Sequence, residues 1–276
     1  MLPLYRLKVT EIVAMAAPIP PHIQPLLDAY LHALESLRGH FYGIYIYGSI
    51  ALDAFEERES DIDIVALTQL EWTEQELRQL AVVHRRLGKE YPLGKRLEPM
   101  YVPLHDMGKY NAQIPPYPYA SHGKLHPAGH FDLNAVTWWT TQHKGIRLFG
   151  PEISALPLEV AWENVLDAMH YNLNTYWPGK AQKPHLFLFD EWVMTAVATL
   201  CRILTAIEEG EIIAKSAALT RWRGRLPVRW HALIDEAWRI RHASKTPSLY
   251  GSRIKRQRET LAFIEYVRTL HNDFLS

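Results

Sequence analysis

The sequence predicts an α+β protein of two domains, in which a small mixed β-sheet flanked by helices precedes a C-terminal helical bundle. In the first half, short aromatic and β-branched runs alternate with stretches of helical apolar spacing. In the second half, apolar residues recur only at intervals of three and four. The Gly150-Pro151 stop separates the two patterns, so we expect domains at 1–150 and 151–276, with residues 1–19 as a peripheral extension.

Three strands are predicted to form the centre of the sheet. The first is Phe41–Tyr47, the second begins at Ser60 and runs to Val65, and the third spans Arg96–Val102. Gly48-Ser49 should break the first strand into a turn, with a helix opening over Ala51–Glu57. Two prolines in and after the third strand indicate an edge strand or a strand bounded by loops.

Helices and a long connection complete the first domain. Apolar spacing predicts a helix over 23–34, and a capping-box pattern at Thr73 begins another that continues to Leu87. Residues 105–131 are rich in Pro, Tyr, His and Gly, and we interpret them as a long functional loop without periodicity. A further helix over 133–144 leads to a short strand before Gly150.

The second half is predicted to be a five-helix bundle without strands. Pro and Gly clusters separate the predicted helices, which are Val160–Trp177, Leu186–Glu209, Ile213–Arg223, Val228–His242 and Ser252–Phe274.

Composition narrows the class of protein. The chain has 276 residues, and its 30 basic side chains balance 30 acidic ones, so no basic excess favours a nucleic-acid partner. The lone Cys201 lies among apolar residues, which predicts a core position and fits a reducing cytoplasm. No apolar run is long enough to cross a membrane.

One motif contains residues suited to binding phosphate and a metal ion. The Gly48-Ser49 turn lets backbone N–H groups approach a phosphate, and Asp61 and Asp63 alternate along the next strand so that both point to one side. Two neighbouring carboxylates repel each other unless a cation lies between them, and hard oxygen ligands of this kind suit Mg²⁺ together with substrate phosphates. Two solvated acids at a strand end are the alternative, which the spacing of the turn and the acids disfavours.

This combination resembles the nucleotidyltransferase superfamily that includes DNA polymerase beta, and within it the streptomycin/spectinomycin adenylyltransferases. Leu97-Glu98 matches a family context in which the glutamate is the general base, and the resemblance implies that Glu98 also touches the metal. Leu200-Cys201-Arg202-Ile203 resembles an L-S-R-I segment, and Gly210 to Lys215 resembles a G-K-I-x-x-K segment.

The resemblance also implies the nucleotide site. Arg202 and Lys215 would hold the phosphates, although alone each would be interpreted as a solvated helix charge. Further nucleotide contacts are expected from Gly48, Ser49, Ser60 and Arg241. Arg241 stands where relatives often have a tyrosine, which is a departure from the family.

The acceptor site is the weakest part of the resemblance. The family presents acidic and amide groups near the start of the long bundle helix, and counting back from Arg202 places Trp192 and Thr195 there. Asp190 and Glu191 lie slightly earlier, where they either contact a cationic acceptor or favour the helix N-terminus.

The sequence therefore predicts an antibiotic-resistance enzyme that transfers AMP from ATP to a hydroxyl of an aminoglycoside or aminocyclitol, with two Mg²⁺ ions. We expect a cytoplasmic monomer with a small cationic acceptor and neither membrane nor nucleic acid as partner. The alternatives are a nucleotidyltransferase that acts on RNA or protein, and an ATP-binding sensor without transfer activity.

Overall fold

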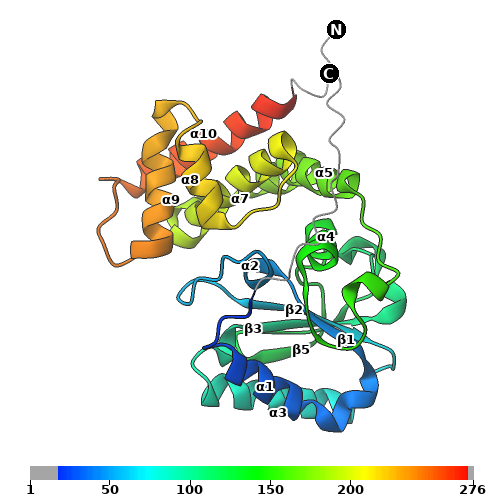
Figure 1. Ribbon diagram of the computed structural model, residues 1–276. Helices are drawn as coiled ribbons and strands as arrows, with labels where there is room; N and C mark the ends of the chain where they lie inside the picture. Colours follow the sequence, from blue (N-terminus) through cyan, green and yellow to red (C-terminus); the bar gives the residue numbers. More distant parts are fainter. Residues whose placement is uncertain (1–17, 273–276) are drawn as a thin grey trace.

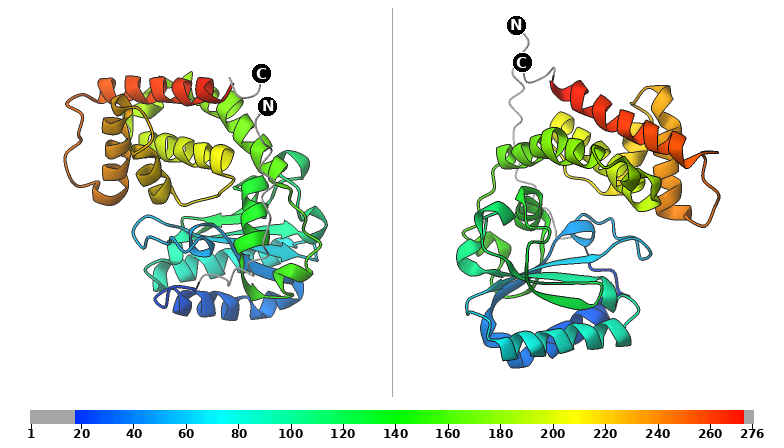
Figure 2. Two further views of the ribbon diagram at one scale, coloured as in Figure 1. Left: turned by 45° about the horizontal axis from the view of Figure 1, so that its top comes forward. Right: turned by 180° about the vertical axis from the view of Figure 1, so that it is seen from behind.

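The computed structural model describes residues 18–272, so most of the predicted N-terminal extension lies outside the described residues. Figure 1 shows a β-sheet covered on one side by α1 and α3, with the helices α5 to α10 gathered on the other side of the molecule. The two views of Figure 2 agree with this arrangement. The predicted α+β class, with a flanked sheet followed by helices, is confirmed.

The sheet has six strands in the order β5-β4-β3-β2-β1-β6. Strands β2 and β3 run parallel, and the other neighbouring pairs are antiparallel, so the sheet is mixed as predicted. Their bounds are β1 Phe41–Ile46, β2 Ile62–Thr68, β3 Leu97–Pro103, β4 Tyr117–Ser121, β5 Lys124–Gly129 and β6 Ile146–Phe149.

Alternation along the strands divides the side chains between two cores. Ile46, Ile62 and Ile64 pack against α1 (Gln24–Ala33) and α3 (Glu74–Glu90). Tyr45, Val65 and Met100 face the opposite side, where α4 (Ala135–Lys144) lies. Because side chains alternate with period two, Asp61, Asp63 and Glu98 also belong to the α4 face.

The predicted capping box of α3 is present. The Glu76 backbone N–H donates to Thr73 Oγ1 at 3.3 Å, and the Thr73 N–H donates to Glu76 Oε2 at 2.9 Å. These two bonds satisfy donors that the first turn of a helix leaves without partners.

The helix predicted over Ala51–Glu57 is wrong in its bounds, because α2 spans only Gly48–Ala51. The chain instead leaves α2 through Asp53, whose φ of 51° is incompatible with a continuing helix. Residues 54–60 form a loop closed by hydrogen bonds that compete with helix formation. The Glu56 N–H donates to Ser60 Oγ at 3.0 Å, and the Arg96 guanidinium donates to the Glu57 carbonyl at 3.0 Å.

The interpretation of 105–131 as a long loop without periodicity is wrong in part, because Tyr117–Ser121 and Lys124–Gly129 form the hairpin β4–β5. His122 and Gly123 connect the strands with φ values of 53° and 73°, which match a tight hairpin turn. Since β4 adds to the sheet beside β3, the third strand is not an edge strand. Its prolines are tolerated because β4 pairs with it in register only at Met100↔Tyr119.

The second half is helical. Its main helices are α5 Trp162–Tyr171, α6 Trp177–Ala181, α7 Asp190–Glu209, α8 Lys215–Arg223, α9 His231–Ala243 and α10 Arg253–Asn272. The predicted first helix is interrupted by a π-helical turn over Asn172–Tyr176 before α6. α7 passes through the centre, and Cys201 is fully buried in its core as predicted. Burial raises the pKa of the Cys201 thiol.

The packing shifts the transition between the two parts. Leu156, Leu158 and Val160 belong to the core beneath α4 rather than to the bundle. By packing, the bundle begins near residue 160, and the division at 150 stays a prediction. Among residues 18–272, no helix combines the length and apolar character that a membrane span requires.

Candidate active site

Three carboxylates meet at one end of β2 and β3. Asp63 pairs in register with Glu98 on the parallel neighbouring strand, and Asp61 lies two positions before Asp63 on the same face. Glu98 is 8% exposed, Asp63 is half-buried and Asp61 is exposed. The predicted juxtaposition of the two aspartates with Glu98 is therefore present in the geometry.

The closeness of the three carboxylates changes their pKa values. Burial, followed by the nearby charge of Asp61, raises the pKa of Glu98 to about 7, against a hydrogen bond from the His122 backbone that lowers it. Burial, followed by the charges of Asp132, Asp61 and Glu98, holds the pKa of Asp63 well above its usual range. A bound cation would remove this repulsion, because each carboxylate would then face positive charge.

The turn before the acids leaves no room for a side chain. Gly48 has φ of +65°, and a Cβ on it would lie 1.9 Å from Asp63 Oδ2. The next residue, Ser49, has a buried Oγ for which the described part of the chain provides no hydrogen-bond partner. The backbone at Gly48, which has no side chain, and the unsatisfied hydroxyl of Ser49 both suit a phosphate. The residues present therefore fit a triphosphate with its divalent cation.

No three acidic, histidine or cysteine side chains within residues 18–272 are arranged to hold a metal ion alone. Mg²⁺ commonly takes one or two carboxylates and completes its shell with water and substrate phosphates. The geometry therefore fits a metal that enters with a nucleotide better than one held permanently.

Sequence reasoning missed Asp132, which precedes α4 and lies near the acids. Its charge raises the pKa of both Asp63 and Glu98. Asp132 as a residue is exposed, but the protein atoms around its carboxyl group raise the pKa of that group by desolvation. The charges of Arg202 and Lys215 lower the same pKa. Asn134 Nδ2 donates to its Oδ1 at 2.9 Å. The only sequence signal was an acid just before the helix that covers the acidic face.

The bundle brings two cations toward the acids. Arg202 lies on α7, and its Nε donates to the Ile213 carbonyl at 2.8 Å. Burial lowers its pKa, and the charges of Asp132 and Asp63 oppose that change. Lys215 begins α8, and its pKa is lowered by burial and by Arg202 and Arg241, against the charges of Asp63 and Asp61. Both cations predicted to contact phosphate thus face the carboxylates across the two parts of the chain.

Arg241 makes a direct contact between these parts. Its Nη2 lies 2.7 Å from Glu56 Oε2, and its Nε donates to Ser216 Oγ at 2.9 Å. The Ser216 hydroxyl also donates to Glu56. Sequence reasoning missed Glu56, which lies in the loop after α2. Ser60 is 5% exposed, and its Oγ accepts the Glu56 N–H, so its side chain shapes this loop.

The predicted acceptor residues divide into two groups. Asp190 begins α7 without a side-chain cap, and its carboxylate lies 2.7 Å from Arg256 Nη2 and 3.5 Å from Arg239 Nη2. These arginines also bind the fully buried Glu236, so Asp190 belongs to an ionic cluster inside the bundle.

The other three, Glu191, Trp192 and Thr195, are not fully buried. Thr195 and Trp192 precede Arg202 by intervals that keep all three near one side of α7, and Trp192 lies about 15 Å from Arg202 along the helix axis. The Lys180 ammonium lies 5.0 Å from the Trp192 ring centroid and 5.0 Å from that of Tyr176. A cation of the chain itself therefore contacts the predicted acceptor region.

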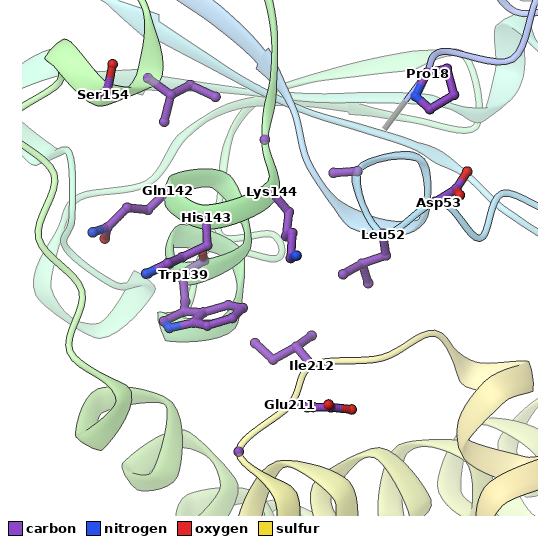
Figure 3. Close-up of a pocket in the computed structure, with 14 residues that line it drawn as sticks. Pro18, Leu52, Asp53, Trp139, Gln142, His143, Lys144, Ser154, Glu211 and Ile212 are labelled. Carbon is purple, nitrogen blue, oxygen red and sulfur yellow. The ribbon is translucent and has the colours of Figure 1, made fainter. Parts of the chain in front are cut away.

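A cavity of about 800 Å³ lies beside this site, between the end of α2, α4 and the connection after α7. Figure 3 shows Trp139 and His143 of α4 opposite Glu211 and Ile212. None of the three predicted metal-binding acids lines it, so the functional assignment rests on the carboxylates and the cations and not on this cavity.

The Gly-Ser turn, the strand carboxylates and the bundle cations are the features on which the sequence resemblance to nucleotidyltransferases is based. Residues 160–267 match the family model of the aminoglycoside adenylyltransferase C-terminal domain. Comparison with curated proteins gives no match.

Among solved structures, the chain is similar to the spectinomycin adenyltransferase AAD(9) from Enterococcus faecalis, determined with ATP and spectinomycin. The TM-score is 0.64 at 16% identity, over 89% of this chain and 99% of that one. The predicted resemblance is therefore confirmed, and the fold and the family match are those of an O-adenylyltransferase.

Gly48→Ala is expected to disturb the acid site from the backbone. The added Cβ would both strain a left-handed residue and collide with the Asp63 carboxylate, so we expect about 1–3 kcal/mol of destabilisation and a displaced Asp63. Chemical denaturation and a crystal structure of the variant would measure this. Gly179→Ala is the control, because its Cβ would meet nothing within 4 Å; equal stability loss in both variants would contradict the steric account.

Glu98→Gln is expected to stabilise the metal-free protein at alkaline pH. The pKa of Glu98 rises from 4.5 to about 7 on folding, so the folded state binds more protons between these values and wild-type stability falls as pH rises through this window. The amide removes that loss, on the order of 1–3 kcal/mol at pH 8, and changes little at pH 4. Thermal unfolding with a chelator at both pH values tests this, and a variant less stable at pH 8 would contradict it.

Proposed function

We propose that this chain transfers AMP from ATP to a hydroxyl of an aminoglycoside or aminocyclitol antibiotic and releases pyrophosphate. The observation that carries the proposal is the pairing of Asp63 with Glu98 opposite Arg202 and Lys215. The family match of the bundle supports the acceptor class, and the ATP and spectinomycin in the similar structure support the nucleotide and an acceptor of this kind.

In this proposal Asp61, Asp63 and Glu98 would hold Mg²⁺, with two ions expected. The metal would supply charge neutralisation at the phosphates when bound. Gly48 and Ser49 would lie against the triphosphate, where the backbone is open and the Ser49 hydroxyl lacks a partner among the described residues. The raised pKa of Asp63 supports the assignment, since a dense group of carboxylates needs positive charge.

Glu98 would act as the general base. Its pKa of about 7 suits a group that takes a proton from a hydroxyl near neutral pH. The acceptor oxygen then attacks the α-phosphorus of ATP as its proton passes to Glu98, and the bond from that phosphorus to the bridging oxygen breaks. Pyrophosphate carries away the electron pair of the broken bond.

Arg202 and Lys215 would receive the negative charge of the leaving pyrophosphate. They come from the bundle while the carboxylates come from the sheet, which supports a reaction between the two parts of the chain. Arg241 is engaged by Glu56 and would contact nucleotide only beside or in place of that carboxylate. Ser60 would contribute mainly by shaping the 54–60 loop.

The acceptor would contact Glu191, Trp192 and Thr195. Asp190 is a weaker candidate than the sequence indicated, because two arginines already neutralise it. Lys180 adds a positive charge against Trp192, so an acceptor with few cationic groups at this end is favoured. We further propose that the enzyme is cytoplasmic and acts as a monomer. One chain supplies both the acids and the cations, which supports the monomer.

Pyrophosphate release from ATP and Mg²⁺ is the direct test. We expect release that depends on an acceptor from a panel including streptomycin and spectinomycin, with mass spectrometry showing an adenylylated product. Glu98→Gln should keep ATP binding and lower transfer by about 10²–10⁴-fold. Activity only with RNA or protein hydroxyls, or ATP binding without release across a broad panel, would refute the antibiotic acceptor.

Asp63→Asn should abolish Mg²⁺-dependent binding of ATP, because the amide removes the charge that faces Gly48 and Glu98. Calorimetric titration of ATP with and without Mg²⁺ measures this. Asp53→Asn is the matched control, since Asp53 is exposed and asparagine tolerates its positive φ. Equal ATP affinity in wild type and Asp63→Asn would remove Asp63 from the metal site.

A further inference from the structure

A buried hydroxyl without a partner lies beside the acids. Tyr47 is 3% exposed, and its Oη has no hydrogen-bond partner within residues 18–272. Leaving a buried polar group without a hydrogen bond is unfavourable. Such a group in a folded protein calls for an explanation, and a ligand-dependent role is one of them.

The register places Tyr47 next to Asp63. Tyr45 pairs with Val65 and Ile46 with Ile64, and the Tyr47 N–H donates to the Asp63 carbonyl at 3.0 Å. Tyr47 is thus opposite Asp63 on one side, as Glu98 is on the other. Side chains in register on neighbouring strands point to the same face, so Tyr47, directly after β1, forms a row with Asp63 of β2 and Glu98 of β3.

A phenol with an ordinary pKa of about 10 is protonated at neutral pH, so the Tyr47 hydroxyl can act as a hydrogen-bond donor. The carboxylate of Asp63, on the neighbouring strand, is an acceptor on the same face. The neighbouring Tyr117 is already engaged, since its hydroxyl donates to Asn111 Oδ1 at 2.9 Å and accepts the Phe131 N–H at 3.0 Å.

We propose that Tyr47 is a positioning residue, whose hydroxyl donates to the Asp63 carboxylate when a divalent cation and ATP bind. The bond would fix the carboxylate orientation against the repulsion of Asp132 and leave its other lone pairs for the cation. Groups that hold metal ligands in this way commonly affect metal affinity by about 10- to 100-fold. The proposal rests on the proposed nucleotide and metal site.

The test compares Tyr47→Phe with Tyr45→Phe. Tyr45 is two residues before Tyr47 and belongs to the same core, but its hydroxyl donates to the Pro151 carbonyl at 3.0 Å. Mn²⁺ binding in the presence of a non-hydrolysable ATP analogue, followed by electron paramagnetic resonance, should weaken about 10- to 100-fold for Tyr47→Phe and stay unchanged for Tyr45→Phe. Equal weakening in both variants, or none in Tyr47→Phe, would overturn the positioning role.

A second measurement covers a variant that fails to fold. In wild-type protein labelled at tyrosine Cζ, the Tyr47 resonance should shift on titration with Mg²⁺ and the analogue, because the hydroxyl acquires an acceptor. An unshifted resonance while Mn²⁺ binds normally would refute only the role of Tyr47. A wild-type protein that binds neither Mn²⁺ nor the analogue would refute the proposed function itself, and the inference with it.

Discussion

The mutual repulsion of carboxylates placed side by side on β2 and β3 is the constraint on which the rest of the site depends. Parallel pairing puts Asp63 against Glu98 on a face that also buries apolar residues, so both acids are partly desolvated. Without a cation between the two acids, this arrangement costs free energy. In the proposed function, Arg202 within α7, Lys215 at the start of α8 and the open backbone at Gly48 would together favour a metal-bound triphosphate beside these acids.

Local pattern predicted the relative positions of these residues where neighbouring residues in the chain determine them. Gly48 and the alternating aspartates lie within one strand-turn-strand unit, and Glu98 follows from a parallel strand placed next to it. Asp132 and Glu56 escaped prediction because they lie on irregular segments, whose position depends on tertiary contacts. The hairpin β4–β5 was missed because His122 takes a left-handed conformation that the sequence alone rarely signals.

The acceptor region shows a different limit of sequence reasoning. The position of Asp190 in the chain suggested a free acid, yet Arg239 and Arg256, distant in sequence, neutralise it through the cluster around Glu236. Lys180, on α6, lies against Trp192 in the same region. A resemblance can locate such a surface, but the charge that it presents to a ligand depends on pairings that spacing does not encode.

The helix α7 carries residues of two predicted contact regions, one for the phosphates and one for the acceptor. Arg202, which faces the carboxylates, and Thr195 and Trp192, toward its beginning, share a single helix whose buried side is packed around Cys201. In the proposed function, a tilt of this helix would move the pyrophosphate contact and the acceptor contacts together. Acceptor preference and turnover would then be coupled, and repacking of the core behind α7 would alter both.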